Sequence, residues 1–164
     1  MSKQYTKQIV LHSGLILLCI GQQIAAGNPT TANSVSVSAE LSVGDLMDKI
    51  TILEIKVERI DNYSKKLNIV RELESLYKTV TSHLTESTEF CELTKKLRYI
   101  NTMLWDIEDN IRRKIQQKEY DEEFIEIAKS VSFNNNIRFL IKRQINELVG
   151  SRLIEEKSSG WILK

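Results

Sequence analysis

The chain has 164 residues, of which 41% are hydrophobic and 27% charged, a composition typical of one folded domain rather than of a disordered chain. Its 23 basic and 22 acidic residues give a net charge of +1. This balance argues against a nucleic-acid partner, which requires a surplus of lysine and arginine. One proline and six glycines leave few helix breakers, so the composition favours long helices.

The residues that most often carry metal or nucleophilic chemistry are sparse. The two cysteines and two histidines are Cys19, Cys91, His12 and His83, and their spacing matches no zinc motif. Glycine-rich phosphate loops are also absent. We therefore expect no metal and no cofactor, and the sequence identifies no catalytic residue. Cys91 is expected to pack as a small apolar residue, with a Cys–His nucleophile as the alternative.

The first 27 residues have the outline of a signal peptide or an N-terminal anchor. Lys3 and Lys7 precede an apolar run at residues 9–21, and small residues follow at positions 25–27. If the segment is an uncleaved anchor, it would meet the membrane through residues 9–24. Alternatively, the segment is a helix that covers the domain, or it results from a start codon placed too early.

Residues 28–39 are predicted to form a polar linker, in which residues 34–38 alternate Val with Ser and suggest a short strand. Localisation depends on the segment before this linker. The protein is exported or membrane-anchored if residues 1–27 act as a signal.

From Ser42 onward, apolar residues recur at steps of three and four, the spacing of an amphipathic helix. Helices are predicted at residues 42–60, 64–84 and about 89–118, with Ser42 and either Ser87 or Thr88 as caps. A shorter C-terminal pair is predicted at 121–131 and 137–148, separated by a turn at Asn134–Asn136 and ended by Gly150. The expected fold is an all-α antiparallel bundle at residues 40–158, with a tail at 159–164.

The third predicted helix carries the longest apolar seam. It comprises Phe90, Leu93, Leu97, Ile100, Leu104, Ile107 and Ile111. A seam of this length predicts coiled-coil-like packing against the first two helices or against a second copy. Our candidate interface is Leu97, Ile100, Leu104, Ile107 and Ile111, and a homodimer is the expected assembly. A different protein partner is the alternative.

The same helix carries a charged stretch at residues 104–114. Its charges are explained by i,i+4 pairs, Glu108 with Arg112 and Asp109 with Arg113, on a solvated face. Trp105 borders the seam and suggests a pocket or an interface.

A candidate ligand site combines this helix with the start of the last predicted one. It comprises Trp105, Asp106, Asp109, Asn134, Arg138 and Lys142. A helix start with two cations would suit a phosphate or carboxylate. The alternative is that these cations only form ion pairs with nearby glutamates.

Four blocks of this sequence, in order, resemble a family of short helical proteins of unknown function from bacteria and some phages. The blocks are residues 40–60, 104–112, 121–131 and 141–158, and "LWDIED" and "INELVGS" are the most specific. Members are often encoded near sugar-transferase or lipopolysaccharide genes, which implies a cytoplasmic location. They typically start near "SVSAELSVG", so residues 1 to about 36 are additional.

These patterns favour a non-enzymatic helical interaction protein, accessory to cell-envelope polysaccharide or lipopolysaccharide synthesis as the resemblance implies. The alternative is a small helical enzyme or a protein that binds sugar phosphates or other anions. Chorismate-mutase-like chemistry would require Lys49, Arg59 and Arg71 inside the bundle, and the remaining blocks do not match that enzyme.

Overall fold

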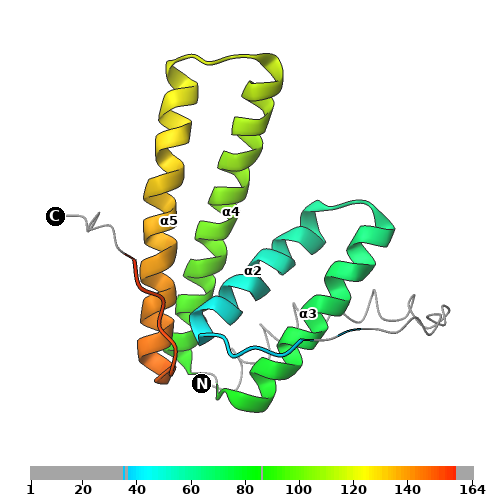
Figure 1. Cartoon of the computed structure of the whole chain (residues 1–164), viewed down its shortest axis with the longest axis vertical. Helices are drawn as coiled ribbons and strands as arrows, with labels where there is room; N and C mark the ends of the chain where they lie inside the picture. The colour runs from blue at the N-terminus through cyan, green and yellow to red at the C-terminus, as the bar shows by residue number, and fades with distance from the viewer. Residues whose placement is uncertain (1–34, 36, 86, 158–164) are drawn as a thin grey trace. The chain divides into compact units, whose positions relative to one another are not determined.

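The computed structural model describes residue 35 and residues 37–85 and 87–157. They contain four helices, namely α2 (Val43–Arg59), α3 (Tyr63–His83), α4 (Thr88–Gln117) and α5 (Glu122–Val149) (Figure 1). These residues include no strand, so the all-α prediction is confirmed. The short strand predicted at residues 34–38 is not supported at Val35 or Val37, and both side chains are highly exposed. The predicted signal segment and the tail at 159–164 lie outside the described residues.

The chain divides into two units, Met1–Glu40 and Leu41–Lys164, and all four helices belong to the second. Their ends follow the capping residues. The Ser42 and Ser87 side chains accept hydrogen bonds from the backbone N–H groups of Asp45 and Phe90. Gly150 ends α5 with a φ of 65°, as predicted for a left-handed cap.

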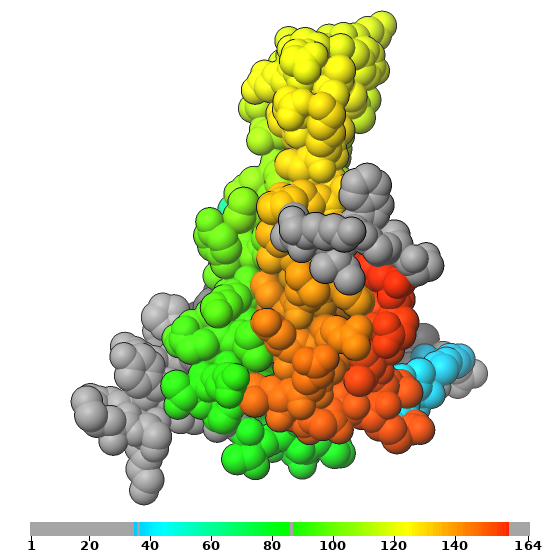
Figure 2. Space-filling view, turned by 90° about the vertical axis from the view of Figure 1, so that its left-hand side faces the viewer, coloured from blue at the N-terminus to red at the C-terminus, as the bar shows by residue number. Residues whose placement is uncertain are grey.

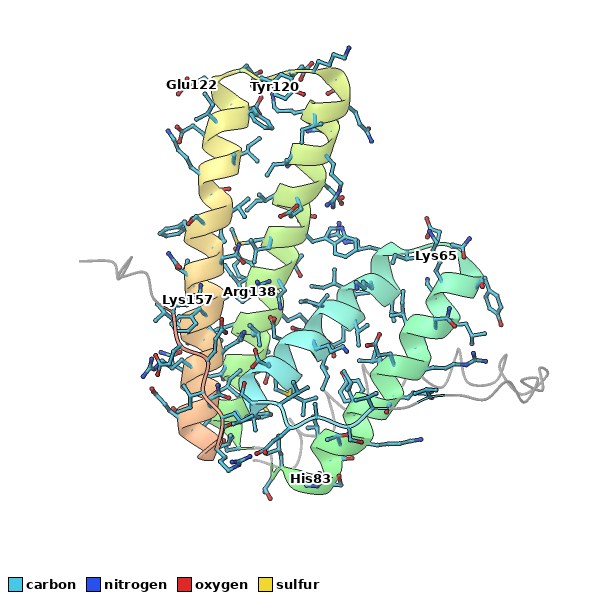
Figure 3. All side chains as sticks on the ribbon, viewed as in Figure 1. Lys65, His83, Tyr120, Glu122, Arg138 and Lys157 are labelled. Carbon is cyan, nitrogen blue, oxygen red and sulfur yellow. The ribbon has the colours of Figure 1, made fainter. Side chains whose placement is uncertain are left out.

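Helix α2 packs against α3, α4 and α5, while α4 and α5 run antiparallel beside each other (Figure 1). Above the end of α2, α4 and α5 continue as a two-helix projection, which Figure 2 shows as a narrow extension. We call residues 104–133 the arm, and the remaining described residues of the second unit the base. Tyr120 and Glu122 mark the tip of the arm (Figure 3).

The predicted seam of α4 is confirmed, but its burial changes along the helix. Within the base and at its border the seam side chains are buried, namely Phe90, Leu93, Leu97, Ile100 and Leu104. In the arm, Ile107 and Ile111 are only half-buried. The predicted interface residues Leu97, Ile100 and Leu104 are therefore already covered within one chain.

The predicted pair of C-terminal helices is wrong, because α5 is one continuous helix through Asn134–Asn136. Val131, Asn134, Arg138 and Ile141 follow one another at steps of three and four, so one face of α5 continues across the asparagines. Asn134 is buried, and its Nδ2 donates to the Ser130 carbonyl 2.8 Å away. Tertiary packing thus overrides the local turn preference of asparagine.

The N-terminus of α2 is fastened to the C-terminal part of α5. Gly44 N–H donates to Asn146 Oδ1 at 2.6 Å, and Val43 N–H donates to Ser151 Oγ at 3.2 Å. A Cβ on Gly44 would lie 2.5 Å from the Lys142 carbonyl oxygen, so only glycine fits this crossing. Two of the sequence blocks that carry the family resemblance therefore meet here.

Candidate functional site

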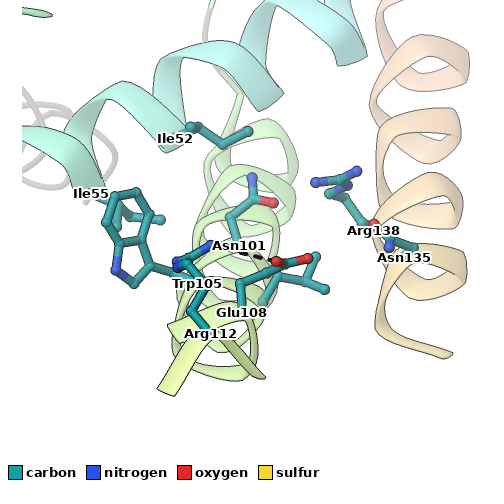
Figure 4. A pocket seen from close by; sticks show the side chains of 9 residues that line it. Ile52, Ile55, Asn101, Trp105, Glu108, Arg112, Asn135 and Arg138 are labelled. Carbon is teal, nitrogen blue, oxygen red and sulfur yellow. Dashed lines mark ion pairs between the residues drawn. The ribbon is translucent and has the colours of Figure 1, made fainter. Parts of the chain in front are cut away.

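An open hollow of about 430 Å³ lies where the arm leaves the base. Its apolar wall includes Ile52 and Ile55 of α2 and Leu104 and Trp105 of α4. Its polar lining comes from α4 and α5, namely Asn101, Glu108, Arg112, Asn135 and Arg138 (Figure 4). Three helices therefore contribute to one site.

The two charged residues from α4 neutralise each other. Arg112 Nη1 lies 3.5 Å from Glu108 Oε2, which confirms the predicted i,i+4 pair, and Arg112 Nη2 lies 2.5 Å from Asp109 Oδ1. Asp109 therefore pairs with Arg112 and not with Arg113 as predicted. Arg113 instead donates to Asn110 Oδ1 at 2.8 Å. Neither Glu108 nor Arg112 carries a charge without a partner.

Arg138 differs from them, because it has no hydrogen bond or ion pair to any residue that the structure describes. It is half-buried, and Figure 4 shows its guanidinium end extending from α5 toward the space that Asn101 enters from α4. A guanidinium group is always charged and offers several donors, so it can hold a phosphate or a carboxylate through two hydrogen bonds.

Asn101 supplies an acceptor to the same hollow. Its Nδ2 donates to Asp48 Oδ1 at 2.8 Å and to Thr51 Oγ1 at 2.9 Å, which fixes the orientation of the amide. Asn101 is 4% exposed, and its Oδ1 has no hydrogen-bond partner within the described part of the chain. A buried acceptor without a donor costs roughly 1–3 kcal/mol, so a donor from a bound molecule would relieve this penalty.

The structure brings together only two of the six predicted ligand-site residues, Trp105 and Arg138. Asp106 lies 3.1 Å from Arg59 in an exposed ion pair, and Asp109 is paired with Arg112. Asn134 is buried within α5, and this part of α5 has no free helix start for an anion. Asn101 was not among the residues predicted from sequence, and the signal for it would have been its position beside the seam residue Ile100.

Lys142 belongs to a separate polar cluster that joins α2, α5 and the segment after α5. Its Nζ lies 2.6 Å from Asp45 Oδ1 and 2.5 Å from Glu155 Oε2. Burial alone would lower the pKa of Lys142, but the hydrogen bonds that its ammonium donates to the two carboxylates, together with their negative charges, outweigh burial and raise the pKa. Lys142 is thus held as a charged structural residue.

Lys114 is a second buried cation that sequence analysis missed. It is 5% exposed and lies 2.8 Å from Glu123, 3.0 Å from Asp121 and 3.7 Å from Glu119. Hydrogen bonds from Lys114 to Glu123 and Asp121 raise the lysine pKa well above its usual value. This cluster closes the tip of the arm.

Other kinds of site receive no support from the described residues. They contain no group of three His, Cys, Asp or Glu side chains able to hold a metal ion, and none of their helices is long and apolar enough to cross a membrane. Lys49 and Arg59 form exposed ion pairs with Glu72 and Asp106, outside the bundle interior that chorismate-mutase-like chemistry would require.

Comparisons with known proteins place the chain in a family without indicating an activity. No curated protein and no solved structure matches the chain. The family of unknown function DUF6165 matches residues 37–161, which include all four described helices and every residue of the hollow. The protein belongs to the DUF6165 family.

Proposed function

We propose that this protein is a non-enzymatic binding protein for a small anion that also carries hydroxyl groups, such as a phosphorylated or acidic sugar. The observation that carries the proposal is the pair of unsatisfied groups in one hollow, the Arg138 guanidinium and Asn101 Oδ1. Arg138 would bind the anionic group, and Asn101 Oδ1 would accept a hydrogen bond from a hydroxyl group.

The remaining lining suits the body of such a ligand. Trp105 and Ile55 give the hollow an apolar wall, on which the C–H face of a sugar ring can pack. Asn135 adds an amide that can donate or accept a hydrogen bond. The site therefore combines one cation, a few polar groups and an apolar wall, as small-ligand sites do.

The same lining is poorly suited to acid–base catalysis. Among the residues that the structure describes, Glu108 is the only carboxylate that lines the hollow, and it is half-exposed and paired with Arg112. A general acid or base must be free to exchange a proton with the substrate, whereas the Glu108 carboxylate is engaged by Arg112. We therefore favour binding over reaction. The ligand class agrees with an accessory role in bacterial cell-envelope polysaccharide synthesis, the role that the sequence resemblance implies.

The proposal can be tested by titrating the full-length protein with glucose 1-phosphate, glucuronate, inorganic phosphate and glucose. In a Trp161→Phe background the fluorescence comes from Trp105, which lines the hollow. We expect the two anionic sugars to bind more tightly than phosphate or glucose alone. Arg138→Gln should weaken their binding by about tenfold or more, because a charge-assisted hydrogen bond is lost.

Arg113→Gln is the matched control, because it removes the same charge from an exposed residue that does not line the hollow. This variant should bind the anionic sugars as the parent does. The proposal would be refuted if none of the four probes bound, or if Arg138→Gln and Arg113→Gln weakened binding equally.

A further inference from the structure

The arm presents one helical face whose pattern is self-complementary. Trp105, Glu108, Arg112 and Ile115 follow one another on α4 at steps of three, four and three, so they share one side of the helix. We call these four residues the arm face. Glu108 and Arg112 are about half-exposed and Ile115 is 46% exposed, so this side is accessible among the described residues.

This side is open because α2 ends below it. Asn101, on the same side of α4 as Glu108 and Ile115, is covered by α2 through its bonds to Asp48 and Thr51. Helix α2 ends at Arg59, and beyond that level the described part of the arm contains only α4 and α5. A pair of helices leaves apolar side chains partly uncovered, which a further helix would bury.

We propose that the arm face pairs with the arm face of a second copy of this chain, with the two α4 helices antiparallel about a two-fold axis near Asn110. Reversal about this point places Glu108 opposite the second copy's Arg112, and Trp105 opposite its Ile115. The charge pair and the apolar pair then each form twice, as an isologous interface requires. Pairing with a second copy accounts for the order of apolar, acidic, basic and apolar residues along the arm face.

The proposed interface differs from the one expected from the α4 seam. Leu97 and Ile100 are buried inside one chain, so a second copy could reach neither without unfolding the base. Ile115 contributes to the arm face although the sequence analysis did not select it.

The arm face shares three residues with the lining of the hollow, Trp105, Glu108 and Arg112, so a second copy paired there would compete with a bound ligand. Arg138 is not part of the arm face, so its substitution separates the two proposals.

The test compares two isoleucines of the arm by sedimentation of the full-length protein over a wide range of concentrations. Ile115 lies on the arm face, whereas Ile125 lies on α5 next to Phe124 and is 43% exposed, so the two are matched in type and exposure. We expect the unchanged protein to form dimers. Ile115→Glu should weaken dimerisation by about tenfold or more, and Ile125→Glu should leave it unchanged.

Charge reversal gives the second, more specific measurement. Arg112→Glu places like charges opposite each other and should weaken the dimer, while the double variant Glu108→Arg with Arg112→Glu should restore it. Thermal melting will show that each variant is folded.

A monomeric full-length protein at all concentrations would refute the proposal and indicate that another segment or partner covers the arm face. Equal effects of the two isoleucine variants, or no restoration by the double reversal, would place any dimer interface elsewhere.

Discussion

Ile100 and Ile107 lie seven residues apart on the same apolar seam of α4, yet Ile100 is 4% exposed and Ile107 is half-buried. The difference lies in what packs around the helix. In the base, α2 adds a third layer against α4 and α5, whereas the described arm has only two helices. The same sequence pattern therefore contributes different amounts to stability, because burial requires neighbours on more than one side.

The polar residues of the two regions differ in a similar way. In the base they connect different helices, as when Asn146 accepts from Gly44 N–H or Asn101 donates to Asp48. In the arm, Arg112 and Arg113 bond to residues of their own helix. Two arm residues are exceptions, because Lys114 connects α4 to the start of α5 at the tip and Asp106 pairs with Arg59 of α2. The base is thus joined by tertiary contacts and the arm mainly by local ones.

The largest predicted change in stability tests the difference in packing between the base and the arm. Ile100→Ala should lower the free energy of unfolding by about 3 kcal/mol, since it opens a cavity in a fully packed region. Ile107→Ala removes the same atoms from a half-buried position and should cost about 1 kcal/mol. Urea denaturation of the two variants measures both values. Equal losses would mean that the arm is as well packed as the base.

The next largest losses of stability are expected from substitution of two glycines, Gly44 and Gly150. Gly44→Ala would place a Cβ 2.5 Å from the Lys142 carbonyl oxygen, and neither backbone can move freely. We expect a loss of about 2 kcal/mol from this overpacking. Gly150→Ala meets no atom within 4 Å but must adopt a φ of 65°, which should cost about 1 kcal/mol.

Both glycine variants can be measured by urea denaturation beside the unchanged protein. If Gly44→Ala proved the milder of the two, the close approach of α2 and α5 would not limit the stability of the base.

Much of the fold was predictable because it depends on local signals. The α4 seam, the caps Ser42 and Ser87 and the end of α5 at Gly150 follow from spacing and capping preferences that act within a few residues. The Asn134–Asn136 segment was not predictable in this way, because its helical state depends on packing against α4. The next seam position after Ile111 is Lys114, so the burial of this lysine could have been predicted from the spacing.

The candidate site was less predictable than the fold. Trp105 and Arg138 were both selected, but their meeting depends on how α4 and α5 align along their length, which no local pattern reports. Asn101 lies one residue from the seam, and its role as a buried acceptor in the site depends on the hydrogen bonds that its amide donates to residues of α2. Sequence spacing gives the face of a helix, whereas a site depends on the register between helices.

The smallest predicted effect concerns the pH dependence of the arm tip. The pKa of Asp121 lies below its ordinary value of 3.8, first because Phe124 N–H donates to its carboxylate and then because Lys114 does so. A carboxyl group with a lowered folded pKa stabilises the fold above its unfolded pKa, and that contribution is lost as the pH falls through the folded pKa.

Asp121→Asn isolates the charge, because asparagine also caps a helix well. At about pH 6 the variant should melt at a slightly lower temperature than the unchanged protein, and at about pH 3 or below the difference should shrink toward zero. Thermal melting followed by circular dichroism across this range measures the difference. If the difference in melting temperature stayed constant with pH, the Asp121 charge would not stabilise the tip. Lys114 would then be held there by Glu123 and the more distant Glu119, so its contacts would depend on two carboxylates rather than three.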